Sequence, residues 1–199
     1  MVVHTIGDSH SLFGWRDIPG ISIHYLGARL CFSVGRDGLE SLTKYSVNEG
    51  DTIIFCFGEI DSRCHVHKHI NEDTDYKKVI DSLVNKYFIK IKASVDSFTN
   101  LRTVVYNVVP PVEKKDVPAN PSYPHLGTDE ERKEYVVYFN KVLKEKCLEY
   151  DYVFFNVYDK YIDECGYLNK SLSDGNVHIR DGRYIREYLE ENLGFCQKQ

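Results

Sequence analysis

The 199-residue sequence lacks the features that mark membrane-spanning, exported and repetitive proteins. No apolar run approaches the ~20 residues that a membrane-spanning helix needs, so we expect no membrane span. The N-terminus has no basic region followed by an apolar stretch, which predicts no secretory signal and a cytoplasmic protein. Internal repeats and low-complexity tracts are missing too, so we expect one globular domain over residues 1–199.

An excess of positive charge and paired cysteines are also missing. The formal net charge is −5, whereas a dedicated nucleic-acid binder carries a basic face or stripe, so we expect no nucleic-acid partner. The six cysteines form no Cys-x-x-Cys pair, which predicts free thiols in a reducing compartment. Cys64, His65, His67 and His69 alternate along the chain, which is not the spacing of a standard zinc site, and we predict no bound metal.

Short β-like runs alternate with longer helical ones, which predicts an α/β protein with a parallel sheet. Residues 52–57 are a continuous apolar run between glycines, the profile of a strand buried on both faces. We expect five strands: the run before Gly7 and residues 21–26, 52–57, 102–109 and 152–156. We expect helices over residues 75–97, 128–150 and 183–193, and two short helices within residues 28–45.

Two segments carry clear local signals for the ends of these elements. Thr128, with Glu131 three residues later, predicts a capping box at a helix start, and Gly194 predicts the end of the last helix. Residues 110–126 contain five prolines and form a loop longer than most connections. Such a loop is commonly a lid or a wall of a binding site.

The strand ends predict where a site lies. Ser9, Gly27, Gly58 and the loop that starts at Pro110 each follow a strand directly. In a parallel sheet they therefore lie at the same edge, and ligands bind outside the carboxyl ends of such strands.

The first block at this edge is Gly7-Asp8-Ser9-His10. Gly7 permits a tight bend, and the following turn exposes the serine hydroxyl and aims backbone N–H groups at its ligand. The alternative is an ordinary helix cap. The block resembles the nucleophile motif of the SGNH (GDSL-type) hydrolases, with His10 in place of the usual leucine.

The second chemical block lies before the last helix, where Asp174-Gly-Asn-Val-His178 resembles the Asp-x-x-His block of the same family. The resemblance implies that Ser9 is the nucleophile, that His178 takes its proton and that Asp174 orients His178. Here the aspartate precedes the histidine by four residues rather than three. Gly175 can absorb the extra residue, and a Ser9–His178 dyad or a structural histidine are the alternatives.

The third block follows the strand at residues 52–57, where the family carries Gly-x-Asn-Asp. Gly58 and Asp61 match the ends of the motif, but Ile60 replaces the asparagine that stabilises the oxyanion, and Arg63 is the nearest substitute. We expect an extended segment in which Glu59, Asp61, Arg63 and His65 point one way toward Ser9, a surface ion pair of Arg63 being the alternative.

A glycine after the second strand supplies another oxyanion donor in this family. Gly27 directly ends the expected strand and is our prediction, with Gly35 as the rival. The backbone N–H of Ser9 would be a further donor.

The resemblance covers essentially the whole chain. It implies a three-layer α/β/α sandwich with a five-stranded parallel, flavodoxin-like sheet, and two-step ester hydrolysis without a cofactor. The polar residues after Gly58 favour a small-molecule or glycan ester, such as an O-acetylated sugar. An O-acyltransferase acting on saccharides and a non-catalytic binding module on the same fold are the alternatives. The sequence predicts no oligomeric state.

Overall fold

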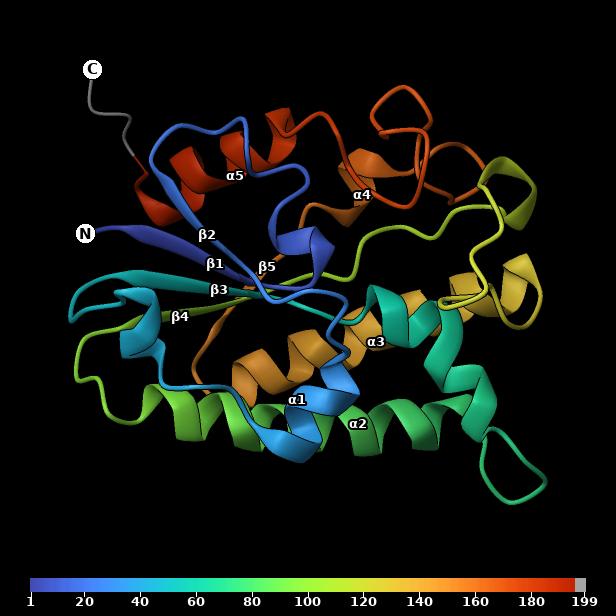
Figure 1. Cartoon of the computed structure of the whole chain (residues 1–199), viewed down its shortest axis with the longest axis horizontal. Coiled ribbons are helices and arrows are strands. Elements are labelled where there is room, and N and C mark those ends of the chain that lie inside the picture. Colours follow the sequence, from blue (N-terminus) through green and yellow to red (C-terminus); the bar gives the residue numbers. More distant parts are fainter. Residues whose placement is uncertain (196–199) are drawn as a thin grey trace.

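Five parallel strands form one sheet in the computed structural model, which describes residues 1–195 (Figure 1). The strands are β1 (Val3–Gly7), β2 (Ile21–Tyr25), β3 (Thr52–Cys56), β4 (Arg102–Tyr106) and β5 (Val153–Phe155). Their spatial order is β2-β1-β3-β4-β5, and all four neighbouring pairs are parallel. β1 and β3 are buried along their whole length because they lie inside the sheet with a helical layer on each face.

Helices cover both faces of the sheet and give it three layers. α1 (Cys31–Asp37), α2 (Tyr76–Val95) and α3 (Asp129–Glu149) lie on one face, and α4 (Tyr158–Tyr161) and α5 (Arg183–Leu193) lie on the other (Figure 1). Each face has its own apolar core: Phe55 packs with the α1–α3 layer, and Ile54 packs with the α5 layer. Alternate residues of one strand thus serve opposite cores, as the pleat requires. The expected three-layer α/β/α architecture is confirmed.

Local signals set the helix ends. The Thr128 hydroxyl accepts the N–H of Glu131 and the Glu131 carboxylate accepts the N–H of Thr128, which confirms the predicted capping box of α3. Asp75 caps α2, and Gly194 ends α5 in a left-handed conformation. The predicted strands at 21–26 and 102–109 are shorter in the structure, because the chain leaves the sheet at Tyr25 and Tyr106.

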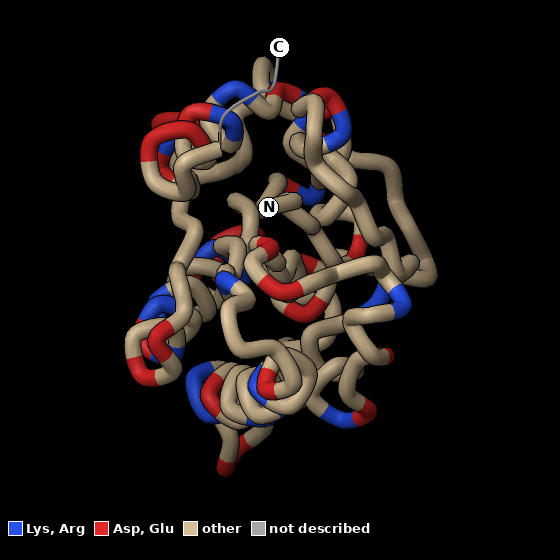
Figure 2. Tube along the Cα trace, turned by 90° about the vertical axis from the view of Figure 1, so that its left-hand side faces the viewer, with Lys and Arg blue, Asp and Glu red and all other residues tan. Residues whose placement is uncertain are grey.

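The outer layers carry mixed charge. Lys and Arg positions alternate with Asp and Glu positions along the outer helices, without a stripe of one sign (Figure 2). Many of them pair one helical turn apart, as Lys92 does with Asp96. Among the described residues, no helix has the length and apolar character needed to span a membrane.

Candidate active site

Ser9 sits where β1 leaves the sheet. β1 ends at Gly7, Asp8 follows, and the short 3₁₀ turn η1 (Ser9–Ser11) begins there. A Cβ at Gly7 would lie 1.9 Å from the carbonyl oxygen of Cys56, so glycine is required by the close approach of β1 to β3. Gly7 is not among the glycines with a positive φ, so the close approach of the two strands, rather than a left-handed turn, is what requires glycine here. The Asp8 carboxylate caps η1 by accepting the N–H of His10 at 2.8 Å.

The loop before α5 presents the imidazole of His178. Ser173 and Ile179 form an isolated antiparallel bridge, and the N–H of Asp174 donates to the carbonyl of His178 at 3.0 Å. Asp174 therefore lies directly across a tight hairpin from His178. Gly175 takes a φ of +84° at the tip of this hairpin, a conformation that side chains rarely adopt. The hairpin explains how a spacing of four residues still brings the two side chains together.

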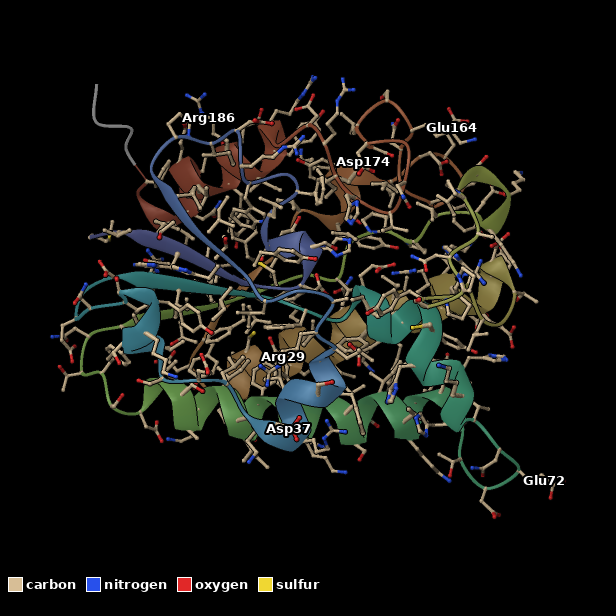
Figure 3. The ribbon with its side chains drawn as sticks, in the orientation of Figure 1. Arg29, Asp37, Glu72, Glu164, Asp174 and Arg186 are labelled. Atoms are coloured by element: carbon tan, nitrogen blue, oxygen red, sulfur yellow. The ribbon has the colours of Figure 1, made fainter. Side chains whose placement is uncertain are left out.

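Ser9, His178 and Asp174 form one chain of hydrogen bonds. His178 Nδ1 lies 2.8 Å from Asp174 Oδ2, and His178 Nε2 lies 2.9 Å from Ser9 Oγ. An ionised carboxylate only accepts hydrogen bonds, so Nδ1 carries the proton and Nε2 is free to accept the Ser9 O–H. Figure 3 shows Asp174 in the loops on the α4 and α5 side of the sheet, whereas Asp37 lies with α1 on the opposite side.

Electrostatics favour a neutral His178 beside a charged Asp174. Burial lowers the pKa of His178, the positive charge of His10 lowers it further, and the hydrogen bond to Asp174 only partly opposes both. Burial alone would raise the pKa of Asp174, but hydrogen bonds from His178 and from the N–H of Asn176 bring it below its usual value. The neutral imidazole is the form that takes a proton from a hydroxyl.

Phe13 belongs to the site although none of the sequence motifs includes it. Its ring stacks on the His178 ring, with centroids 4.1 Å apart and planes 16° apart. The contact covers one face of the imidazole and contributes to its burial. In the sequence, Phe13 is marked only by its position four residues after Ser9. That spacing occurs in every helical turn and does not by itself indicate a contact with the base.

The segment after β3 differs from the prediction. It is helical rather than extended, with the π-helical segment η3 at Asp61–His65. Side chains two residues apart on a helix do not share a face, so Asp61, Arg63 and His65 do not converge on Ser9. Only Glu59 and Arg63, four residues apart, lie together as an ion pair.

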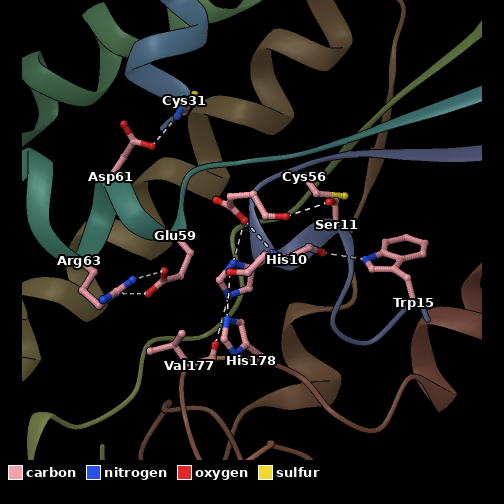
Figure 4. A network of polar contacts seen from close by, with 12 residues as sticks. His10, Ser11, Trp15, Cys31, Cys56, Glu59, Asp61, Arg63, Val177 and His178 are labelled. Atoms are coloured by element: carbon pink, nitrogen blue, oxygen red, sulfur yellow. Dashed lines mark hydrogen bonds and ion pairs between the residues drawn. The ribbon is translucent and has the colours of Figure 1, made fainter. Parts of the chain in front are cut away.

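Asp61 points away from Ser9 and serves the fold. Its carboxylate accepts the N–H groups of Cys31 at 2.7 Å and of Phe32 at 3.0 Å, which begin α1. Burial raises the pKa of Asp61 to about 7 despite these two hydrogen bonds. Figure 4 shows this contact on the opposite side of Glu59 from His178. The predicted site role of Asp61 is therefore not supported by its position.

His65 also lies apart from Ser9. Its ring packs against Phe32 and His69, with centroid distances of 4.4 Å to each. Burial and the neighbouring charges of His69 and Lys68 lower the pKa of His65 to about 4. These three side chains line a separate cavity of about 300 Å³ between the start of α1 and α2. Ser9 is not among the residues that line it.

Arg63 is held too firmly to replace the missing asparagine. Its Nε and Nη2 bond to Glu59 at 2.7 and 3.1 Å, and its Nη1 donates to the carbonyl of Tyr123 at 2.6 Å. The N–H of Leu126 donates to the Arg63 carbonyl, so both contacts tie the proline-rich loop to this turn. The loop thus forms a wall beside the site. Ile60 is buried, and its side chain cannot donate a hydrogen bond.

The two glycine candidates for the oxyanion site have different positions. Gly35 lies inside α1 against Lys86 and Tyr87 of α2, where a Cβ would meet backbone and side chain at 3.1 Å. It is a helix-packing residue. Gly27 follows β2, whose end pairs in register with the end of β1, so it lies at the same sheet edge as Ser9. No hydrogen bond within residues 1–195 occupies the backbone N–H of Ser9 or Gly27.

A cavity of about 160 Å³ with both polar and apolar walls borders the base loop. It lies between the proline-rich loop and the loops that follow α4, and Ser173, Gly175 and Asn176 on its wall flank Asp174. Its other charged and hydroxyl-bearing walls are Glu113, Asp116, Asp163, Tyr167 and Lys170. Within the described residues, no three His, Cys, Asp or Glu side chains form a group that could hold a metal ion.

No protein-family model and no curated protein sequence matches the chain. Solved structures do match. A Streptococcus pneumonia protein named after platelet activating factor aligns with a TM-score of 0.67 and 16% identity over 96% of this chain and 83% of that one. A GDSL-like lipase from Bacteroides thetaiotaomicron aligns with a TM-score of 0.62 and 11% identity over 96% and 87%.

The OSK domain of Drosophila Oskar aligns similarly, with a TM-score of 0.59 and 13% identity over 96% of this chain and 88% of that one. Identities this low show the fold alone. The chain has the fold of the SGNH (GDSL-type) hydrolases, as the first sequence block indicated. What the chain does depends on its own site.

Proposed function

We propose that the chain is a serine esterase with Ser9 as nucleophile, His178 as general base and Asp174 as the group that orients His178. The distance of 2.9 Å from Ser9 Oγ to His178 Nε2 carries the proposal, together with the 2.8 Å contact of His178 to Asp174. A serine hydroxyl is a weak nucleophile at neutral pH and needs such a base. The likeness to a GDSL-like lipase supports the same reaction class.

The residues present account for both steps of the reaction. Ser9 Oγ attacks the ester carbonyl while its proton passes to His178 Nε2, and the imidazolium then gives that proton to the departing alcohol. Water attacks the acyl-enzyme with His178 again as base, which releases the acid and restores Ser9. The oxyanion would accept the backbone N–H groups of Ser9 and Gly27, where a donor contributes roughly 3 kcal/mol.

The substrate that fits these surroundings is a polar ester such as an O-acetylated sugar. The cavity of about 160 Å³ next to Asp174 supports this choice, because carboxylates and hydroxyls on its walls suit a polyhydroxyl alcohol. The buried Glu59–Arg63 pair adds further polar groups near His178. The cytoplasmic location is supported by five unpaired cysteines among the described residues.

A fluorophosphonate probe tests the nucleophile. We expect stoichiometric labelling of wild type, none of Ser9→Ala, and loss of acetyl-ester hydrolysis in Ser9→Ala and His178→Ala. Ser11→Ala is the matched control, since Ser11 Oγ bonds to the Asp8 carbonyl rather than to a base. Unlabelled wild type would contradict the esterase and favour a binding module. Acetyl transfer to an added sugar in preference to water would identify an acyltransferase.

A further inference from the structure

His10 makes two hydrogen bonds that connect distant parts of the chain. Its Nδ1 lies 3.0 Å from Asp8 Oδ1, and its Nε2 lies 3.2 Å from the carbonyl oxygen of Val177 (Figure 4). Asp8 precedes Ser9 and Val177 precedes His178, so one imidazole joins the neighbour of the nucleophile to the neighbour of the base. The side chain is 5% exposed, and water does not compete for these contacts.

The two partners define the protonation of His10. A carbonyl oxygen only accepts, so Nε2 carries a proton. Asp8 Oδ1 also accepts the backbone N–H of His10, so it is an acceptor and Nδ1 carries a proton as well. With these partners both ring nitrogens donate, an arrangement that favours the imidazolium form of His10. Burial alone would lower the pKa of His10, but the charge and hydrogen bond of Asp8 raise it above the usual value.

This charge lies next to the base. The rings of His10 and His178 have centroids 5.1 Å apart and tilt by 44°. The groups that face His10 are Asp8, Glu59 and His178, and those that face His178 are Asp174, His10 and Glu59. Two imidazolium rings this close repel each other, so the proton on His10 disfavours a second proton on His178.

We propose that His10 is a positioning residue that ties the Ser9 turn to the His178 loop and, when protonated, places a positive charge beside His178. The tie holds Ser9 Oγ within reach of His178 Nε2 although 169 positions separate the two residues. The charge keeps His178 in the neutral form that accepts the Ser9 proton. The expected effect on rate rests on the proposed esterase activity. The hydrogen bonds of His10 and the titration of His178 do not, because both can be measured without substrate.

Two variants separate the tie from the charge. His10→Gln keeps side-chain hydrogen-bonding groups and loses the charge, whereas His10→Leu loses both. We expect the pKa of His178 to rise in both variants, because the positive charge of the neighbouring His10 ring is gone. The acid limb of kcat/KM would move to higher pH by the same amount. The plateau rate would fall less than about tenfold in His10→Gln and clearly more in His10→Leu.

The direct measurement is an NMR titration of the His178 imidazole, with His69→Gln as the matched control at an exposed histidine. An unmoved His178 titration in His10→Gln would overturn the role of the charge. Equal plateau rates in wild type and His10→Leu would overturn the tie, and His10→Gln decides the charge if His10→Leu does not fold. The titration needs no turnover, so an inactive wild type would refute the esterase without deciding this proposal.

Discussion

Arg63 and Glu59 form a doubly hydrogen-bonded ion pair one helical turn apart, with the side chains 11% and 9% exposed. The charge of Arg63 keeps the pKa of Glu59 below its usual value, although burial alone would raise it. Each charge of this buried pair offsets the cost of removing the other from water, so the loss of either one leaves an unpaired buried charge. Arg63 also donates to the carbonyl of Tyr123, so substitutions at the pair test how the proline-rich loop is attached to the turn after β3.

The first prediction concerns the loss of one partner. Arg63→Met leaves the Glu59 carboxylate buried and unpaired, and it should lower the free energy of unfolding by about 3–5 kcal/mol. The double variant Glu59→Gln/Arg63→Met should recover most of this loss in urea unfolding. Lys92→Met at the exposed Lys92–Asp96 pair is the control and should change stability little. Equal losses in the single and double variants would show that the pair is not coupled.

The second prediction concerns Asp174. Asp174→Asn keeps the size of the side chain but offers an amide where His178 Nδ1 donates, so the imidazole loses the tautomer that accepts from Ser9. We expect kcat on an acetyl ester to fall by roughly 10³–10⁴-fold with KM changed far less. Asp159→Asn, at an exposed position of α4, is the control. An unchanged kcat would mean that Asp174 has no part in orienting His178.

The third prediction concerns the close approach at Gly7. Gly7→Ala would place a methyl group 1.9 Å from the Cys56 carbonyl oxygen, so β1 and β3 must separate. We expect a loss of roughly 1–3 kcal/mol or more in thermal unfolding, from overpacking at backbone that cannot yield. Gly50→Ala is the comparison, because nothing lies within 4 Å of its Cβ and its cost comes only from the backbone strain of a φ of +81°. A smaller effect at Gly7 than at Gly50 would contradict the packing argument.

The fourth prediction concerns acid stability through His125. Burial and the charges of Arg63 and Arg132 lower the pKa of His125 to about 4. Below about pH 6.5 the unfolded chain takes a proton at this residue while the native protein does not. Stability from this group is therefore full at neutral pH and falls as the pH drops from about 6.5 toward 4.

Urea unfolding at pH 7 and pH 5 measures this effect. Wild type should lose more stability between the two pH values than His125→Gln, which has no group to titrate there. Lys144→Gln on the surface of α3 should keep the wild-type difference. A His125→Gln variant with the full wild-type pH dependence would show that His125 titrates normally in the native protein.

Local sequence patterns determined where most strands and helices of this protein begin and end. Short apolar or alternating runs predicted the five strands, three-and-four spacing predicted α2, and Thr128 with Glu131 predicted the start of α3. Parallel strands place their carboxyl ends at one edge, so the sequence also brought Ser9, Gly27 and Gly58 to the same edge. These inferences succeed because propensity, capping and strand direction act over a few residues.

Only the tertiary structure decided how the side chains point. The segment after β3 is helical, and in it the Asp61 carboxylate accepts the N–H groups of Cys31 and Phe32, about thirty positions away. That contact sends Asp61 and His65 away from Ser9, contrary to the extended segment that we expected. The bonds of His178 to Ser9 and of His10 to Val177 likewise join opposite ends of the chain. Sequence motifs identify such residues as candidates, but whether their side chains come into contact depends on how the whole sheet and its helices pack.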